Sequence, residues 1–359
     1  MNPEPVSSQK NMDADSYNEE LKALPILDGV LREEASRQLK AYGCRDHGFV
    51  DLRQIPTLGF FNSWLDRGFH GEMKWMERTA RERADVRFAF PQYFTALVIT
   101  IPYDSQESTT GSELNQVSRY AQGRDYHKVI RKILKNLFQD LQILQPALEG
   151  RTYVDTGPLS EKHLASFAGL GWIGKNTNLI SHQHGSLFFL GVLLLNCICT
   201  DFSEPTDHCG TCTRCIDVCP TDAIVEPYII DSRLCLSHET IERVTPTSTE
   251  LQQKGNWIYG CDDCQTCCPY NRFSKPTKIE DFQPRDYSIE KFLNLDEDSF
   301  LKFFEGSPIR RTGYEHFLEN VLAQVAKNPA KYKEHIISLA NRTTSERIKK
   351  RIKDLFGEK

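Results

Sequence analysis

The chain contains no hydrophobic run long enough to cross a membrane. Its longest apolar stretch extends from Leu187 to Ile198 and is interrupted by Gly191 and Asn196, whereas a transmembrane helix needs about 20 predominantly apolar residues. The first twenty residues are polar and contain neither an apolar segment nor a twin arginine. Residues 1–20 are therefore predicted to be a disordered tail and not a targeting signal. These absences predict a cytoplasmic protein without a membrane partner.

The sequence also lacks an overall excess of positive charge. It carries 44 Lys and Arg against 49 Asp and Glu, which gives a formal net charge of −5. Any contact with nucleic acid must therefore be local. From Arg310 to the C-terminus, twelve Lys and Arg stand against six Asp and Glu. On charge alone, a solvated helix face is the simpler explanation of this excess.

Most of the chain is poor in cysteine. Of the twelve cysteines, only Cys44 lies outside residues 197–268, and this clustering indicates a cofactor site and not a disulfide framework. The cysteines form two runs, Cys209-x2-Cys212-x2-Cys215-x3-Cys219-Pro220 and Cys261-x2-Cys264-x2-Cys267-Cys268-Pro269. The first run has the spacing of a bacterial ferredoxin with two 4Fe–4S clusters, in which the Cys before Pro ligates the other cluster.

This exchange of ligands predicts two sets of cysteines. The first set is Cys209, Cys212, Cys215 and Cys268. The second set contains Cys219, Cys261, Cys264 and either Cys235 or Cys267, and the spacing does not choose between the last two. Two clusters bound in this way lie close enough to exchange electrons, so the chain is predicted to be a redox protein.

A pair of zinc sites is the alternative, because Cys-x2-Cys pairs also build zinc ribbons. Zinc has no need of the third Cys-x2 step or of the Cys-Pro ending, so iron–sulfur clusters are favoured. Cys197 and Cys199 alternate along an apolar run and are predicted to be small core residues, not ligands.

Residues 21–196 are predicted to form an α/β domain, although no Rossmann fingerprint is visible. Helices are expected between Ser16 and Tyr42 with a break at Pro25, from about Asp125 to Leu144, and through Ala165–Ala168. Strands are expected at Ala96–Pro102, at Thr152–Asp155 and, in two pieces around Gly191, at Leu187–Leu195. Residues 197–276 would form a ferredoxin-like domain with both clusters.

Residues 277–359 have a helical pattern with turns between short segments. Apolar residues mark three helices, at Phe317–Val325, Ile336–Leu339 and Ile348–Leu355, and the arrangement is similar to a small HEAT-like repeat. The expected fold class is a multidomain α+β or α/β protein.

Several stretches together resemble the epoxyqueuosine reductases. They are His70-Gly-Glu-Met-Lys-Trp-Met76 with Arg78, Ser118-Arg-Tyr-Ala-Gln-Gly-Arg-Asp-Tyr-His127, Val154-Asp-Thr-Gly-Pro158, Gly169-Leu-Gly-Trp-Ile-Gly-Lys-Asn-Thr177, both cysteine runs, and Ile309-Arg-Arg-Thr-Gly-Tyr314. The resemblance extends from about Leu21 to the C-terminus. The cysteine runs alone are common to many ferredoxins, whereas the combination is specific.

The resemblance implies that the protein reduces epoxyqueuosine to queuosine at the wobble position of tRNAs with a GUN anticodon. Electrons would pass from an unidentified donor through two 4Fe–4S clusters to cobalamin, and the epoxide oxygen would leave as water. By the same matching, Cys235 and not Cys267 completes the second cluster, and Asp155 is the proton donor. A monomer is expected, because the enzyme must admit a whole anticodon loop.

Cobalamin rests wholly on the resemblance, since the sequence has no Asp-x-His-x-x-Gly run. The residues that match the family's cobalamin-lining stretches are Arg78, Ser118, Lys175, Asn176 and Ser232. Burial beside an apolar corrin would raise the pKa of Asp155 toward neutrality, as a general acid requires. Without the resemblance, Asp155 is more simply a turn-capping aspartate, and Lys175 and Asn176 belong to a loop at a helix start.

The basic helix around Arg131–Lys135, the Arg310-Arg311 pair and the tail Arg347–Lys353 could form one surface that follows tRNA phosphates. Two other functions remain open. Reductive dehalogenases also combine cobalamin with two clusters, but they usually carry a twin-arginine signal and would leave the basic C-terminus without a purpose. A non-catalytic ferredoxin-type carrier would leave residues 21–196 without a role.

Overall fold

The computed structural model describes residues 22–105, 116–243 and 249–357. The predicted disordered tail, residues 1–20, lies outside this part of the chain. None of the helices in the described ranges is both long and apolar enough to cross a membrane. The cytoplasmic location and the monomeric state stay predictions.

A four-stranded antiparallel sheet forms the centre of the N-terminal part. The strand order is β1-β2-β6-β3, with β1 at Asp46–Asp51, β2 at Thr95–Pro102, β6 at Phe188–Leu195 and β3 at Gly150–Tyr153. Every residue of β2 is buried, which confirms the strand predicted from its uninterrupted apolar sequence. Because all pairs are antiparallel, α+β describes this layer better than α/β.

Strand β6 differs from the prediction at Gly191. Two strand pieces were expected around this glycine, but β6 is continuous and pairs Gly191 with Ile99 of β2. A Cβ atom at Gly191 would lie 2.7 Å from Cγ2 of Ile130 and 3.1 Å from Cδ1 of Leu134. The glycine therefore lets helix α7 (Tyr126–Leu144) pack directly against the strand.

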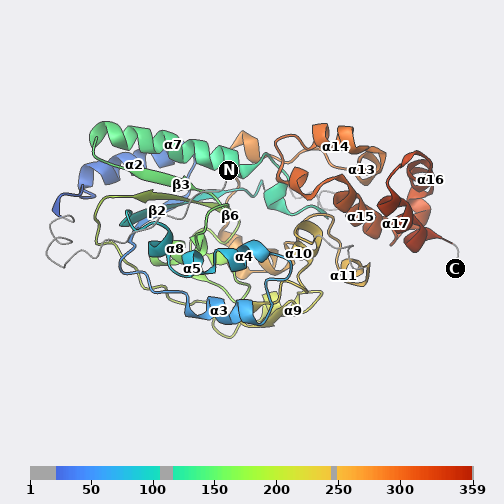
Figure 1. Ribbon diagram of the computed structural model, residues 1–359, viewed down its shortest axis with the longest axis horizontal. Helices are drawn as coiled ribbons and strands as arrows, with labels where there is room; N and C mark the ends of the chain where they lie inside the picture. The colour runs from blue at the N-terminus through green and yellow to red at the C-terminus, as the bar shows by residue number, and fades with distance from the viewer. Residues whose placement is uncertain (1–21, 106–115, 244–248, 358–359) are drawn as a thin grey trace.

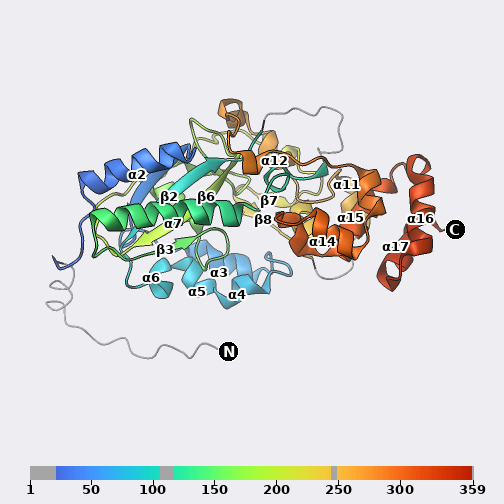
Figure 2. The same cartoon turned by 90° about the horizontal axis from the view of Figure 1, so that it is seen from above.

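Helices cover both faces of the sheet (Figures 1 and 2). On one face, α2 (Gly29–Ala41) lies beside α7, and both join the strands in one apolar core. On the other face, α8 (Glu161–Phe167) buries Leu164 and Ala165. The long amphipathic helix predicted from about Asp125 is confirmed as α7, and Asp125 caps it by accepting the N–H of His127.

Short elements fill the connections. Between β1 and β2 lie α3 (Gly59–Asp66), α4 (Lys74–Arg78), α5 (Ala80–Ala84) and α6 (Val86–Ala89). After α8 comes the hairpin of β4 (Trp172–Ile173) and β5 (Leu179–Ile180). The cysteine-bearing segment contains α9 (Arg214–Asp217), β7 (Ile224–Glu226), β8 (Ile229–Ile230), α10 (Leu236–Ile241), α11 (Thr249–Lys254), α12 (Asp263–Thr266) and the 3-10 helix η3 (Pro269–Phe273).

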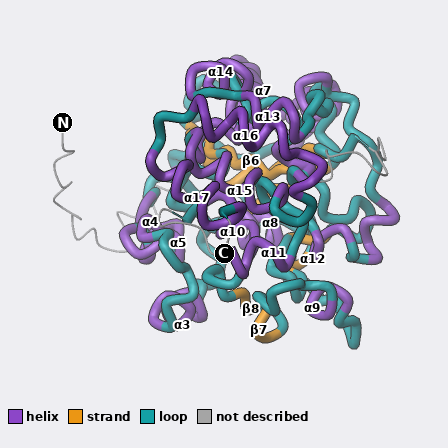
Figure 3. Tube along the Cα trace, turned by 90° about the vertical axis from the view of Figure 1, so that its right-hand side faces the viewer, coloured by secondary structure: helices purple, strands orange, loops and turns teal. Residues whose placement is uncertain are grey.

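The C-terminal end is a group of helices, and Figure 3 looks onto it. The helices are α13 (Ile289–Asn294), α14 (Glu297–Phe303), α15 (Tyr314–Val325), α16 (Lys333–Arg342) and α17 (Glu346–Phe356). The three helices predicted from periodicity are confirmed as α15, α16 and α17. Their core also takes in Val117, Ala121 and Tyr259, so residues distant in sequence join this end to the cysteine-bearing segment.

Candidate cysteine cluster sites and the Asp155 group

The first predicted set of cysteines lines one cavity. Its volume is about 260 Å³, and Cys209, Cys212, Cys215 and Cys268 all face it. Within the described residues, no three His, Cys, Asp or Glu side chains converge on one point as a single ion would require; these cysteines instead surround a space. The composition of the cavity wall fits a cluster with four thiolate ligands.

Two side chains from the β4–β5 hairpin support the first set. The Lys175 ammonium donates to the carbonyl oxygens of Gly210 at 2.6 Å and Cys212 at 3.0 Å. The indole N–H of Trp172 donates to Sγ of Cys209 at 3.5 Å. Hydrogen bonds to ligand sulfur tune the reduction potential of an iron–sulfur cluster, so the hairpin both holds the ligand loop and influences its redox chemistry.

The second set gathers around Cys264. Burial raises the pKa of the Cys264 thiol, and the charges of Cys235 and Cys219 raise it further. Burial also raises the pKa of Cys261, with Asp263, Cys264 and Cys235 adding to the effect. The charges of Cys215 and Cys267 act on Cys264 in the same way, so cysteines of both predicted sets lie near one another, and the membership of the second set stays a prediction.

Cys267 lies near cysteines of both sets. Burial, together with the charges of Cys215, Cys268 and Cys212, raises the pKa of Cys267 to about 12, while the charge of Cys267 acts on Cys264 of the second set. The choice of Cys235 over Cys267 as the last ligand of the second set stays a prediction. Cys197 and Cys199 are confirmed as core residues, because both are buried in the cluster between the sheet and α2.

Asp155 lies two residues beyond the end of β3, so the strand predicted through Asp155 ends earlier, at Tyr153. Its carboxylate is 3.2 Å from Nε2 of His127, and Nδ1 of the same ring is 2.7 Å from the carboxylate of Asp125. The backbone N–H of Asp155 donates to the Glu161 carboxylate at 2.8 Å. We call Asp125, His127, Asp155 and Glu161 the Asp155 group.

The pKa values of His127 and Asp155 are shifted in opposite directions within the Asp155 group. Burial lowers the pKa of His127, but hydrogen bonds to Asp125 and Asp155 outweigh it and raise the pKa to about 9. Burial would raise the pKa of Asp155, yet hydrogen bonds from His127 and Tyr126 bring it below its usual value. A cationic histidine thus stabilises the Asp155 carboxylate. The expected rise in the pKa of Asp155 was argued for burial beside a corrin and stays a prediction.

The pKa of Glu161 is raised, in contrast to that of Asp155. Burial and the neighbouring charge of Asp155 raise the pKa of Glu161 to about 8, so this carboxyl is mostly protonated at pH 7. The Asp155 side chain itself stays 61% exposed, and Lys162 beside it is also exposed. The group thus holds two protons, one on His127 and one on Glu161, next to a carboxylate that solvent can reach.

A tight turn connects the Asp155 group with the second cysteine set. The Lys162 ammonium donates to the carbonyl of Thr177 at 3.0 Å and to Oδ1 of Asn178 at 3.3 Å. From the same turn, the side-chain amide of Asn176 donates to the carbonyl of Cys264 at 2.8 Å. Because the charge of Lys162 acts on both Cys264 and Asp155, the second set is adjacent to the Asp155 group.

The other predicted site residues are mostly engaged with the cysteine-bearing segment. The buried hydroxyl of Ser118 donates to Asp262, the neighbour of Cys261. Ser232 is buried, and its carbonyl accepts the N–H of Cys235 at 3.1 Å. Arg78 ends α4 and is exposed; no described hydrogen bond ties it to these segments. The roles of these residues, and of Lys175 and Asn176, as cobalamin contacts stay predictions.

Sequence reasoning missed His127, Glu161, Lys162 and Trp172 as functional residues. His127 was named from the sequence only as the end of a stretch that matches the family, and its contact with Asp155 went unnoticed. The available signal was the Asp-x-His spacing of Asp125 and His127 at the start of α7, because that spacing lets the aspartate orient the ring.

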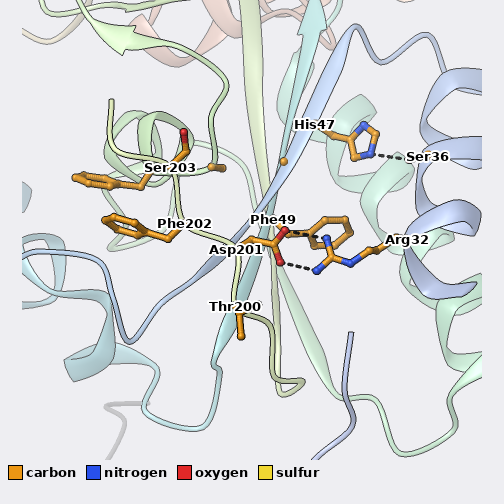
Figure 4. A pocket seen from close by; sticks show the side chains of 11 residues that line it. Arg32, Ser36, His47, Phe49, Thr200, Asp201, Phe202 and Ser203 are labelled. Carbon is orange, nitrogen blue, oxygen red and sulfur yellow. Dashed lines mark hydrogen bonds and ion pairs between the residues drawn. The ribbon is translucent and has the colours of Figure 1, made fainter. Parts of the chain in front are cut away.

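A separate open pocket of about 540 Å³ lies between α2, β1 and the segment after β6 (Figure 4). The guanidinium of Arg32 donates two hydrogen bonds to the Asp201 carboxylate, at 2.9 and 2.5 Å. The hydroxyl of Ser36 lies 2.9 Å from Nε2 of His47. None of the predicted site residues lines this pocket.

Taken together, two sets of cysteines in a ferredoxin-like segment, joined to an α+β layer that carries a carboxylate–histidine group, define an iron–sulfur oxidoreductase. Residues 208–271 match the family described as a 4Fe-4S double cluster binding domain, which removes the zinc alternative. Residues 83–156 match the family described as epoxyqueuosine reductase QueG, DUF1730. The particular family is then clear from the relatives.

The chain is 40% identical over 299 residues to an epoxyqueuosine reductase of Pseudomonas aeruginosa, covering 80% of this chain and 83% of the relative. It is 42% identical over 299 residues to that of Escherichia coli, covering 80% and 78%. The chain therefore belongs to the epoxyqueuosine reductase family, and the recognition made from its motifs is confirmed.

Solved structures agree with the fold. An epoxyqueuosine reductase from Streptococcus thermophilus superposes with a TM-score of 0.75 at 26% identity, covering 89% of this chain and 88% of that one. An epoxyqueuosine reductase solved with an epoxyqueuosine-modified tRNA stem loop has a TM-score of 0.72 at 22% identity, covering 90% and 97%. The mixed helix-and-sheet fold with a double cluster domain is thereby confirmed.

Proposed function

We propose that this protein reduces epoxyqueuosine to queuosine at the wobble position of tRNA, the last step of queuosine biosynthesis. The observation that carries the proposal is its identity of about 40% with epoxyqueuosine reductases over four fifths of the chain. The position of the Asp155 group beside the second cysteine set supports it. A dehalogenase or a plain electron carrier is not favoured, since neither function accounts for the membership of the chain in the epoxyqueuosine reductase family.

Two electrons would enter one cluster one after the other, pass to the second cluster and leave it beside the Asp155 group. Helix α9, which carries Cys215 of the first set, packs against helix α12, which carries Cys264 of the second, and this supports transfer between the two clusters. Two electrons and two protons balance the reaction, because the epoxide becomes an alkene and its oxygen leaves as water.

Cobalamin is the family's expected electron acceptor, and when bound its reduced cobalt supplies the two-electron attack on the epoxide. The residues fit such a group in one respect, because Asp155 and Lys162 stay open to solvent beside the second set. Arg78, Ser118, Lys175, Asn176 and Ser232 are the proposed contacts. Of these, Lys175 and Asn176 already use their side-chain nitrogens on the cluster loops, which leaves their other atoms for the cofactor.

The protein's own part in the chemistry is proton delivery. Nε2 of His127, which its raised pKa keeps protonated at neutral pH, gives its proton to the Asp155 carboxylate, and Asp155 passes that proton to the departing oxygen. Asp125 holds the histidine ring in place through Nδ1. Glu161 keeps the second proton at a carboxyl adjacent to the Asp155 backbone.

The tRNA would approach over basic side chains that surround Asp155. From α7, Arg131 reaches the hydroxyl of Thr156 at 3.2 Å, and from the C-terminal segment the charge of Arg311 acts on Asp155. Basic residues from two distant parts of the sequence thus lie beside the proposed catalytic carboxylate. Arg311 is paired with Glu242, so Arg131 is the one of the two proposed to meet a phosphate.

The test is anaerobic turnover of tRNA that carries epoxyqueuosine, with clusters and cobalamin loaded and verified, followed by nucleoside mass spectrometry. We expect a product lighter by one oxygen. Asp155→Asn should lose at least about 100-fold in rate, the usual contribution of a general acid, whereas the exposed Asp66→Asn should match the parent. No conversion by the loaded parent protein would rule out the proposed reaction.

A further inference from the structure

The first cysteine set lies under a rim of positive charge. Besides its cysteines, the cavity is lined by Lys175, Arg214 and Arg272, and no Asp or Glu belongs to its wall. Lys175 is used internally on the ligand loop, but Arg214 and Arg272 are exposed. The solvent-facing edge of this cavity is therefore cationic.

Aromatic side chains continue the surface beside that rim. Trp172, which donates to Sγ of Cys209, packs 4.9 Å from both His208 and Tyr270, measured between ring centroids. His182 lies 4.8 Å from His208 and 5.4 Å from Tyr270. Trp172 is buried, whereas His182 and His208 are exposed, so a continuous ring-to-ring path connects a ligand of the first cluster with solvent.

This path opens into a second hollow. A pocket of about 250 Å³ is lined by Trp172, His182 and His208, and its wall also contains Asp46 and Glu204. The excess of cations is thus confined to the rim of the cysteine cavity. At that rim, Phe273 is 39% exposed and lies under the guanidinium of Arg272, 4.6 Å from the ring centroid.

The two sets occupy different positions along the electron path. The second set is coupled to the Asp155 group through Asn176 and Lys162. The first set has the exposed rim and the aromatic path. Electrons delivered from outside therefore reach the first set before the second.

We propose that the face formed by His182, His208, Arg214, Tyr270 and Arg272 is the docking surface for the electron donor, and that this donor is an acidic one-electron carrier protein. The proposal rests on the electron path of the proposed function and not on its tRNA substrate. Arginine and aromatic residues are the types enriched at protein interfaces. A cationic rim attracts an acidic partner and raises the association rate.

The test is stopped-flow reduction of the cluster-loaded protein, without tRNA, by reduced flavodoxin as a small acidic carrier. In the double variant Arg214→Glu/Arg272→Glu, the second-order rate should fall at least about tenfold at low salt, and high salt should diminish the difference. Reduction by photoreduced 5-deazariboflavin, which is small and neutral, should be unchanged. The matched control is Arg37→Glu/Lys40→Glu on α2, which should leave both rates unchanged.

Two outcomes would overturn the proposal. Equal slowing with both reductants, together with a shifted cluster potential in an EPR redox titration, would mean that Arg214 and Arg272 set the potential of the cluster and do not bind the carrier. An unchanged rate with flavodoxin would place docking elsewhere. Turnover of epoxyqueuosine tRNA by photoreduced variant protein keeps the two proposals separate, because it depends on the Asp155 group and not on the carrier.

Discussion

At Asp155 the backbone has a φ of +60°, a left-handed conformation that asparagine and aspartate adopt more readily than most residues. The turn moves the carboxylate away from the line of β3 and toward His127 on α7. The neighbouring Val154 is buried in the core beneath the sheet, so the turn is anchored on one side and open on the other. The turn thus presents the Asp155 carboxylate to solvent.

The raised pKa of His127 predicts how the rate depends on pH. His127 carries its proton below about pH 9 and Glu161 below about pH 8, so proton supply is complete at neutral pH and is lost as the pH rises through this range. The turnover rate of the loaded enzyme should fall between about pH 8 and 9. In His127→Gln the rate should be roughly 10- to 100-fold lower. The rate of this variant should still fall at alkaline pH, near pH 8, because Glu161 still loses its proton there. A wild-type profile in this variant would contradict the role of His127.

The choice between Cys235 and Cys267 can be tested by iron content. Cys235→Ser removes a ligand from the second set and should cost up to roughly half of the iron and sulfide after reconstitution. Cys267→Ser should retain both clusters, because in the proposed assignment each cluster already has four other cysteine ligands. Loss of a cluster in Cys267→Ser with full loading of Cys235→Ser would reverse the assignment.

These residues show what the sequence could predict. The cysteine runs have a spacing that reports a ligand geometry directly, so both sets could be proposed without a structure. The pairing of His127 with Asp155 joins residues 28 positions apart across a helix and a turn, and no local pattern records such a contact. The same contact lowers the pKa of Asp155, and this cationic partner was not included in the expectation from the sequence, which considered only burial beside a corrin.

At the scale of elements, apolar periodicity was a reliable guide to the helices. Helices α7, α15, α16 and α17 all follow a 3.6-residue pattern. The pattern did not show that Gly191 continues a strand, since this depends on how α7 packs across it. Nor did it show that Val117 and Tyr259 complete the core of the C-terminal helices, because such recruitment depends on tertiary contacts alone.

Helix α17 is held to α15 by a buried acid. The Glu319 side chain on α15 is 3% exposed and accepts two hydrogen bonds, both 2.7 Å long, from Arg347 of α17. Glu319→Gln removes the charge, and since Arg347 remains one-third exposed we expect a cost of only about 1 to 2 kcal/mol. Amide hydrogen exchange in α17, measured by mass spectrometry on the loaded protein, should become about tenfold faster.

The matched control for this helix is Glu346→Gln, whose partner interaction with Lys349 lies at the surface, with the glutamate side chain 86% exposed. A change in an exposed pair should alter exchange by less than about twofold. If both variants behave alike, the buried pair does not hold α17 in place.

At the scale of the whole molecule, the C-terminal helices form one end of the structure, and α7 lies over the sheet at the other (Figure 1). The structure shows which basic residues of the C-terminal segment are paired within the protein and which face solvent, whereas the sequence shows only their number. Arg347 and Arg351 point inward, to Glu319 and Gln252, and Arg311 is paired with Glu242. The outward-facing basic residues of α17 are Lys349, Lys350 and Lys353, and the acidic Glu346 and Asp354 are exposed on the same helix.

This distinction predicts which residues bind tRNA phosphates. Each phosphate contact adds close to one unit to the slope of log affinity against log salt concentration. Lys350→Glu/Lys353→Glu should therefore weaken binding of an anticodon stem loop and lower that slope by up to about two, measured by fluorescence anisotropy at several salt concentrations. Arg37→Glu/Lys40→Glu on α2 reverses the same number of charges and should leave the slope unchanged. An equal loss in both variants would mean that binding responds to net charge alone, whereas a loss confined to the first would place α17 on the path of the tRNA backbone toward Asp155.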